Sequence, residues 1–95
     1  MLETNAKSLR AIQADPAMLA LGALGWILTD AERAQRMLSL TGLTPDILRE
    51  GVTEQATLAA ILSFLEGHEP DLIAAAQHIG TQPEALVRAR MELEA

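Results

Sequence analysis

The chain has 95 residues, which corresponds to one domain with a thin core, and its 17 alanines and 16 leucines favour helices and exclude a β-sandwich or barrel. The absence of cysteine excludes disulfides, zinc fingers and thiol catalysis. The net charge of −6 comes entirely from residues 50–95, which hold eight acids and two bases, and it disfavours nucleic acids and anionic membrane surfaces as partners.

Proline and glycine divide the chain into six expected helices. A capping residue followed by proline is typical of a helix start, because proline has no N–H to leave unpaired there. Glycine is favoured just past a helix end, since the left-handed conformation costs it nothing. The expected helices run from Pro16 to about Leu28, from the cap at Asp30 to Gly42, from Thr44 and Pro45 to Gly51, from the cap at Thr53 to Gly67, from Glu69 to Gly80, and from Pro83 to the C-terminus.

The N-terminal residues 1–14 are expected to form an arm, and residues 15–95 a single helical domain. Leu9 and Ile12 indicate that the arm is either helical or frayed at the end of the chain. The first ten residues contain acidic and polar side chains where a secretory signal would begin its apolar run. The longest uncharged stretch, residues 16–29, is too short to span a bilayer. We therefore expect a cytoplasmic protein.

The expected fold is an all-α, compact bundle of about six short helices around a central apolar helix, residues 16–28. This helix is apolar on all sides, so we expect it to be buried on all sides, with the other helices packed around it. The helix that ends at Gly67 carries one apolar face at i, i+3, i+4 and i+7. The expected core residues are Leu21, Leu24, Trp26, Leu28, Leu58, Leu62, Phe64 and Leu65.

The two halves of the chain align without a gap at a shift of 38 residues. Four aligned pairs are identical, and they are Leu24 with Leu62, Gly42 with Gly80, Pro45 with Pro83, and Leu48 with Leu86. A true duplication would produce this pattern. Prolines and glycines that start and end helices at similar places in both halves by chance would also produce it. Both explanations stay open, and either one suggests two similar three-helix units that share one core.

Four segments stand out by their order and spacing. They read ALGWILTD (23–30), MLSLTGLTPDILR (37–49), FLEGHEPDLIAAAQHIG (64–80) and PEALVRA (83–89). They resemble a small bacterial family catalogued as domain of unknown function 3572, over residues 15–93. His68 is a departure from the family, in which this position is often acidic. The resemblance implies a compact helical protein and carries no assigned activity.

The first candidate site lies at the elbow between the fourth and fifth expected helices. Glu66, His68, Glu69 and Asp71 offer four carboxylate or imidazole groups within six residues. Such groups bind metals when three or four converge, but the spacing matches no metal signature. Acids in a first helical turn also complement the helix dipole. That interpretation is favoured, and we expect no cofactor, with a metal site left open.

The second candidate is a helix-turn-helix for DNA recognition. Ala76, Gly80 and Leu86 fit its spacing, and Arg88 and Arg90 could reach phosphate. An acid at the start of the would-be reading helix, within an acidic half of the chain, opposes the approach of a phosphate backbone. DNA binding is therefore the alternative function and not the favoured one.

The last helix carries the expected partner-binding surface. Val87 and Met91 lie one helical turn apart, Arg88 and Arg90 flank them, and Glu84 and Glu92 lie nearby. An apolar pair bordered by charges of both signs suits a selective protein contact. The elbow around His68 is the next candidate for this interface.

A competing interpretation places Val87 and Met91 in the core beneath the N-terminal arm.

The sequence contains no nucleophile elbow, phosphate loop or glycine-rich turn, so we expect no enzymatic activity. The favoured function is a cytoplasmic protein-binding or adaptor domain. Its partner is either another protein or a second copy of the chain.

Overall fold

The computed structural model describes residues 15–95, and the expected arm at residues 1–14 lies outside the described residues. The described residues form helices and no strand, so the expected all-α fold with six helices is confirmed. The helices are α2 (Pro16–Ile27), α3 (Ala31–Thr41), α4 (Pro45–Glu50), α5 (Gln55–Glu66), α6 (Glu69–Ile79) and α7 (Pro83–Glu94).

Short polar side chains cap the first turns of α2, α3 and α4. The carboxylate of Asp15 accepts a hydrogen bond from the backbone N–H of Ala17 at 2.9 Å. The hydroxyl of Thr44 likewise accepts from a backbone N–H in the first turn of α4. The predicted cap at Thr53 is wrong by one residue, because Glu54 occupies the cap position of α5 and makes no side-chain hydrogen bond there.

The 38-residue shift superposes helix boundaries as well as residue types. It places α3 (Ala31–Thr41) on α6 (Glu69–Ile79) with the same first and last positions, and it places the start of α4 on the start of α7. Gly42 and Gly80 end the equivalent helices α3 and α6 with φ values of 75° and 86°. These values lie in the left-handed region that glycine adopts without strain.

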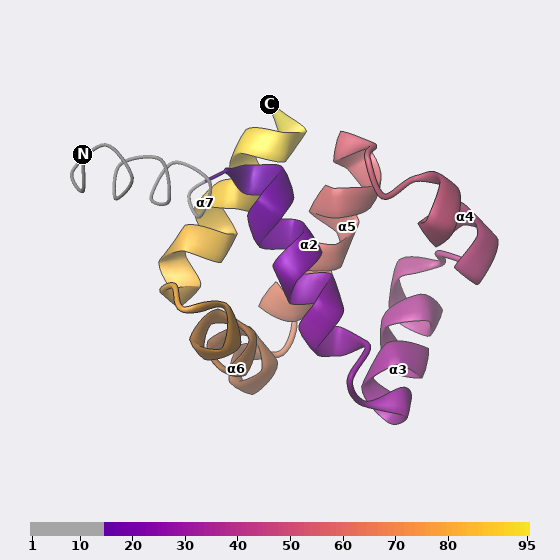
Figure 1. The fold of residues 1–95 in the computed structure, drawn as a ribbon, viewed down its shortest axis with the longest axis horizontal. Coiled ribbons are helices and arrows are strands. Elements are labelled where there is room, and N and C mark those ends of the chain that lie inside the picture. The colour runs from indigo at the N-terminus through magenta and orange to yellow at the C-terminus, as the bar shows by residue number, and fades with distance from the viewer. Residues whose placement is uncertain (1–14) are drawn as a thin grey trace, which may run out of the picture.

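The helix at the centre of the bundle is α5, and the expectation that α2 is central is wrong. Figure 1 shows α2 crossing in front of α5 and α7, with α6 to one side and α3 and α4 to the other. Seven residues of α5 are buried, compared with five of α2. α5, α6 and α7 pack against α2, but one side of this helix remains exposed, as Met18 and Leu21 show.

Five of the eight expected core residues are buried: Leu24, Leu58, Leu62, Phe64 and Leu65. The predictions for Leu21 and Leu28 are wrong, since they are 37% and 52% exposed. An entirely apolar helix has no periodicity by which the sequence could select its inner face. The inner face instead contains two alanines with no exposed surface, Ala20 and Ala23, which let the neighbouring helices approach closely.

Trp26 lies at the rim of the core and not at its centre. Its indole ring is partly buried, and the guanidinium of Arg33 stacks over it at 3.5 Å from the ring centroid. The same guanidinium donates to the backbone carbonyl of Trp26 at 2.7 Å and to the hydroxyl of Thr29 at 2.9 Å. Arg33 therefore closes the C-terminal end of α2 and fixes the turn into α3.

Within residues 15–95, no helix combines the length and the apolar character that a bilayer crossing requires.

Candidate functional site

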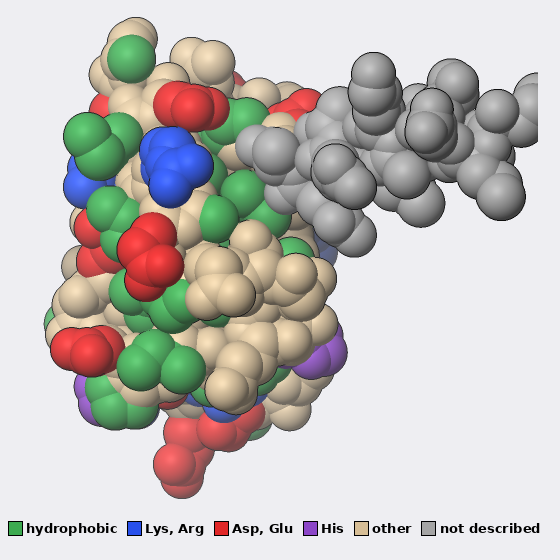
Figure 2. All heavy atoms as spheres, turned by 90° about the vertical axis from the view of Figure 1, so that its left-hand side faces the viewer, with side chains coloured by type: hydrophobic (Ala, Val, Ile, Leu, Met, Phe, Trp, Pro, Cys, Tyr) green, Lys and Arg blue, Asp and Glu red, His purple; other side chains and the backbone are tan. Residues whose placement is uncertain are grey.

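The structure separates the two apolar residues of the predicted partner surface on α7. Met91 is 58% exposed, whereas Val87 packs partly buried against the hydrophobic core. Arg88 is exposed beside them. Val87 also lines a groove of about 380 Å³ between α6 and α7, together with Ile73 and Glu84. Figure 2 shows this side of the molecule, where hydrophobic side chains alternate with acidic and basic ones.

Arg90, the second basic residue of the predicted surface, is engaged within the molecule. Its guanidinium donates to the carboxylates of Glu66 on α5 and Glu94 on α7. The hydrogen bond to Glu66 raises the pKa of Arg90, and the nearby charges of Glu66 and Glu94 add to that rise against the opposing effect of desolvation. Arg90 therefore joins α7 to α5, and Arg88 is the basic side chain that remains available to a partner.

The four ionisable residues at the elbow do not converge on one point. Glu66 is bound to Arg90 of α7, and Asp71 accepts a hydrogen bond from Arg36 of α3 at 2.8 Å. Nε2 of His68 lies 4.0 Å from the carboxylate of Asp71. Nowhere within residues 15–95 do three histidine, cysteine or acidic side chains come together as a metal site would require. Glu66 and Asp71 instead bind arginines of two other helices, α7 and α3.

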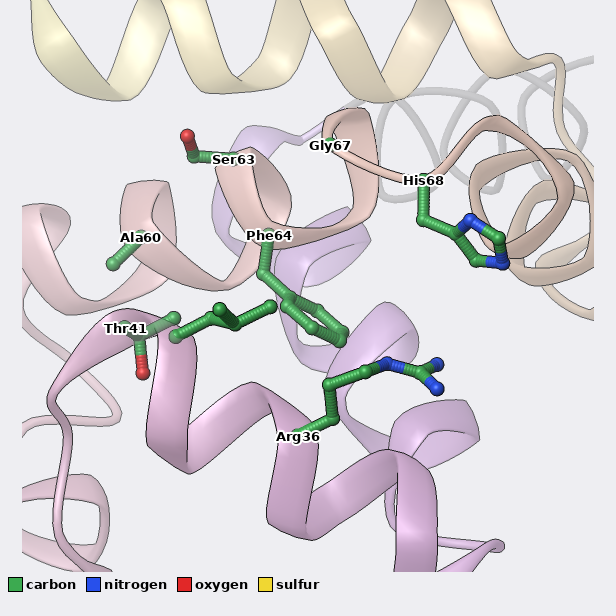
Figure 3. Close-up of a pocket in the computed structure, with 8 residues that line it drawn as sticks. Arg36, Thr41, Ala60, Ser63, Phe64, Gly67 and His68 are labelled. Atoms are coloured by element: carbon green, nitrogen blue, oxygen red, sulfur yellow. The ribbon is translucent and has the colours of Figure 1, made fainter.

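A larger hollow lies on the other side of the same elbow, between α3 and α5. Its volume is about 540 Å³, and its wall includes Phe64 and Ala60 of α5 and Leu40 of α3. Figure 3 shows Phe64 projecting from α5 into the space between the two helices, toward Arg36. Phe64 is only 8% exposed, whereas Leu40 is 73% exposed. We call this feature the α3–α5 hollow, and its rim carries a leucine that no described residue covers.

The α3–α5 hollow has a polar end formed by Arg36 and His68. The guanidinium of Arg36 lies 6.0 Å from the centroid of the Phe64 ring, at the outer range of a cation–π contact. Its hydrogen bond to Asp71 holds it in place from α6. The hollow therefore combines apolar walls with one oriented cation, an arrangement typical of a binding site for an apolar group.

Of the residues that line the hollow, His68 and Phe64 were expected from the sequence to matter, whereas Leu40 and Arg36 were not. The missed signal is the position of Leu40, which lies outside the apolar face of α3 that contains the buried Met37. A large apolar side chain outside the core-facing stripe of an otherwise amphipathic helix marks exposed apolar surface. Arg36 gives no comparable signal, because its partner Asp71 lies 35 residues away along the chain.

Comparison with known proteins identifies a family but no characterised relative. No curated protein and no solved structure matches the chain. One family matches over residues 6–95, and its description reads "Protein of unknown function". The match covers the six helices, the elbow, the α3–α5 hollow and also residues 6–14, which precede α2. The chain therefore belongs to the DUF3572 family, as its segments around the ALGW run and the TGL-x-P turn suggested.

Proposed function

We propose that this protein is a small cytoplasmic protein-binding module, without catalytic activity, that holds an apolar side chain of its partner in the α3–α5 hollow. The observation that carries the proposal is the hollow itself, a space of about 540 Å³ beside a leucine that is 73% exposed. Pockets of this kind hold the apolar anchor residues that dominate protein interfaces.

The free energy available at this site is consistent with a selective contact. Complete burial of one leucine side chain contributes roughly 1.5–3 kcal/mol, and Leu40 has most of that still to gain. Arg36 adds a cation whose orientation Asp71 already fixes, so little side-chain entropy is lost when a partner arrives. A partner with an apolar side chain next to a carboxylate or a carbonyl group would match both features.

A photo-reactive residue at position 40 tests this proposal. We expect p-benzoylphenylalanine at Leu40 to cross-link one discrete partner in cells, which mass spectrometry then identifies as another protein or a second copy. The same residue at Ser39 is the matched control, because Ser39 is exposed on the same helix and does not line the hollow. Equal cross-linking from both positions would show that the α3–α5 hollow is not the contact.

Substitutions then measure the contribution of the hollow to binding. We expect Leu40→Gln to reduce capture of the identified partner several-fold and Ser39→Gln to leave it unchanged, with equal thermal melting of the two variants by circular dichroism. The 58% exposure of Met91 keeps α7 as a second location for the interface. If Met91→Gln abolishes capture and Leu40→Gln does not, the interface lies on α7.

DNA binding by α6 and α7 is the alternative function, and the exposed residues at the start of α7 disfavour it. Glu84 is exposed in the first turn, where a reading helix meets the bases, and Arg90 is held by Glu66. A mobility shift on random duplex DNA that fades steeply with added salt would favour this alternative over protein binding.

A further inference from the structure

The outward face of α2 is an apolar stripe that no described residue covers. Met18, Leu21 and Leu28 are 48%, 37% and 52% exposed, and the exposed Gly25 lies between them. The whole helix contains no charged side chain, so no charge lies among these exposed residues. Positions 18, 21, 25 and 28 follow the spacing 3-4-3, which is the seam that one helix presents to another in a coiled coil.

The chain enters α2 through a break that prevents a continuous helix. Asp15 has an extended backbone, with φ −62° and ψ 122°, and Pro16 disfavours a helical conformation at the residue before it. A helix that preceded Asp15 would therefore not continue the axis of α2, and residues 1–14 join the chain at the end of the stripe nearest Met18.

The sequence of residues 1–14 contains a second stripe with the same spacing. Leu2, Asn5, Leu9 and Ile12 also follow 3-4-3. The two stripes are mirror images about position 15, as the two helices of an antiparallel pair require. The pairs related by this mirror are Ile12 with Met18, Leu9 with Leu21, Asn5 with Gly25, and Leu2 with Leu28.

The one polar member of the N-terminal stripe falls opposite the one member of the α2 stripe without a side chain. Asn5 pairs with Gly25, and a Cβ atom built on Gly25 would meet no described atom within 4 Å. Gly25 thus leaves room for a neighbouring side chain at this position. A single asparagine in an apolar seam also fixes the register of a helix pair.

We propose that residues 2–13 form a helix that folds back antiparallel over the outward face of α2, as an αα-hairpin with its turn at Asp15. The segment has 12 residues, the same number as α2, so the two helices match in length at about 1.5 Å per residue. Tethering gives the segment a millimolar effective concentration at this face, which favours it over a second copy. The family match, which begins at residue 6, includes most of the segment.

Engineered cysteines test the pairing, because the natural chain contains none. The full-length variant Leu9→Cys with Leu21→Cys places one thiol on each stripe at mirror positions. The control variant, Leu9→Cys with Glu50→Cys, moves the second thiol to an exposed position at the end of α4. Each protein is treated with a short bis-maleimide at low micromolar concentration and analysed by intact mass and a denaturing gel.

We expect a several-fold excess of intrachain cross-linked monomer in the 9–21 variant over the 9–50 control. A covalent dimer as the main product of the 9–21 variant would overturn the proposal and identify a second copy as the occupant of the face. Equal intrachain yields in the two variants would also overturn it. A thermal melt of Leu9→Ala, Leu21→Ala and the double variant gives an independent check, since contacting residues produce a double-variant shift smaller than the sum of the single shifts.

Discussion

The two halves of the described chain share most of their helix boundaries but differ in how many hydrophobic residues they bury. A shift of 38 residues superposes α3 on α6 from first to last residue. Yet 12 of the 18 buried hydrophobic residues within residues 15–95 belong to the second half. Caps and glycines therefore determine where the helices begin and end, whereas the side chains between them determine which half forms the core.

The contrast is sharpest between α4 and its counterpart α7. Both begin at a proline, but α4 has six residues and none of them is buried, whereas α7 has 12 residues and buries Leu86, Ala89 and Leu93. Because α4 is less than two turns long, it cannot lie across the bundle as α7 does. The weakly buried helix α3 precedes α4, and the α3–α5 hollow forms where this helix meets the central one.

The largest expected difference between the halves is at the aligned leucines 48 and 86. Leu86 has no exposed surface, whereas Leu48 is partly buried against the edge of the core. We expect Leu86→Ala to lower the free energy of unfolding by about 3 kcal/mol, because it leaves a cavity beneath α7. We expect Leu48→Ala to lower it by about 1 kcal/mol, since the site is open enough to relax. Urea denaturation followed by circular dichroism measures both.

Equal losses at the two positions would contradict the assignment of the core to the second half. The helix content of each variant at zero urea is the control, because both substitutions replace leucine with the stronger helix former. A difference in stability at equal helix content then reports packing alone.

The sequence predicts the helices well because their signals are local. Most boundaries lie beside a capping side chain, a proline or a glycine, and the error at the start of α5 is a single residue. How deeply each helix is buried depends on packing against distant segments. The sequence predicts the buried face only where the opposite face is polar. In α5 the polar Ser63 is exposed, so the sequence indicates which face is buried. In α2 no polar residue distinguishes one face from the other.

The second prediction concerns positions at which the two halves are alike. Gly42 and Gly80 both have a left-handed backbone, and a Cβ atom at either one would meet no described atom within 4 Å. Gly42→Ala and Gly80→Ala should therefore each lower the free energy of unfolding by about 1 kcal/mol, from backbone strain alone. Thermal melts of the two variants check this, and a clear inequality would show that one of these turns packs differently from its counterpart.

The candidate site was harder to predict than the fold because its parts come from distant segments. His68 and Phe64 lie within four residues of each other in a segment whose pattern is visible in the sequence. Arg36 reaches the site only through the packing of α3 on α5 and its ion pair with Asp71. The acids of the elbow looked like metal ligands because the chain does not reveal which arginines they will meet.

The smallest expected effect concerns the start of α6, where the second half lacks a cap that the first half has. Asp30 caps α3 by accepting from the backbone N–H of Glu32 at 3.1 Å, whereas His68, its counterpart at a shift of 38, makes no side-chain cap hydrogen bond. His68→Asp should therefore raise the free energy of unfolding by about 0.5 kcal/mol, less than a typical cap contributes, because Glu69 and Asp71 already place negative charge in that turn. The reverse exchange, Asp30→His, should lower it by about 1 kcal/mol. Urea denaturation of both variants measures the pair, and a loss of stability in His68→Asp would show that the imidazole contributes a contact at the elbow that outweighs a helix cap.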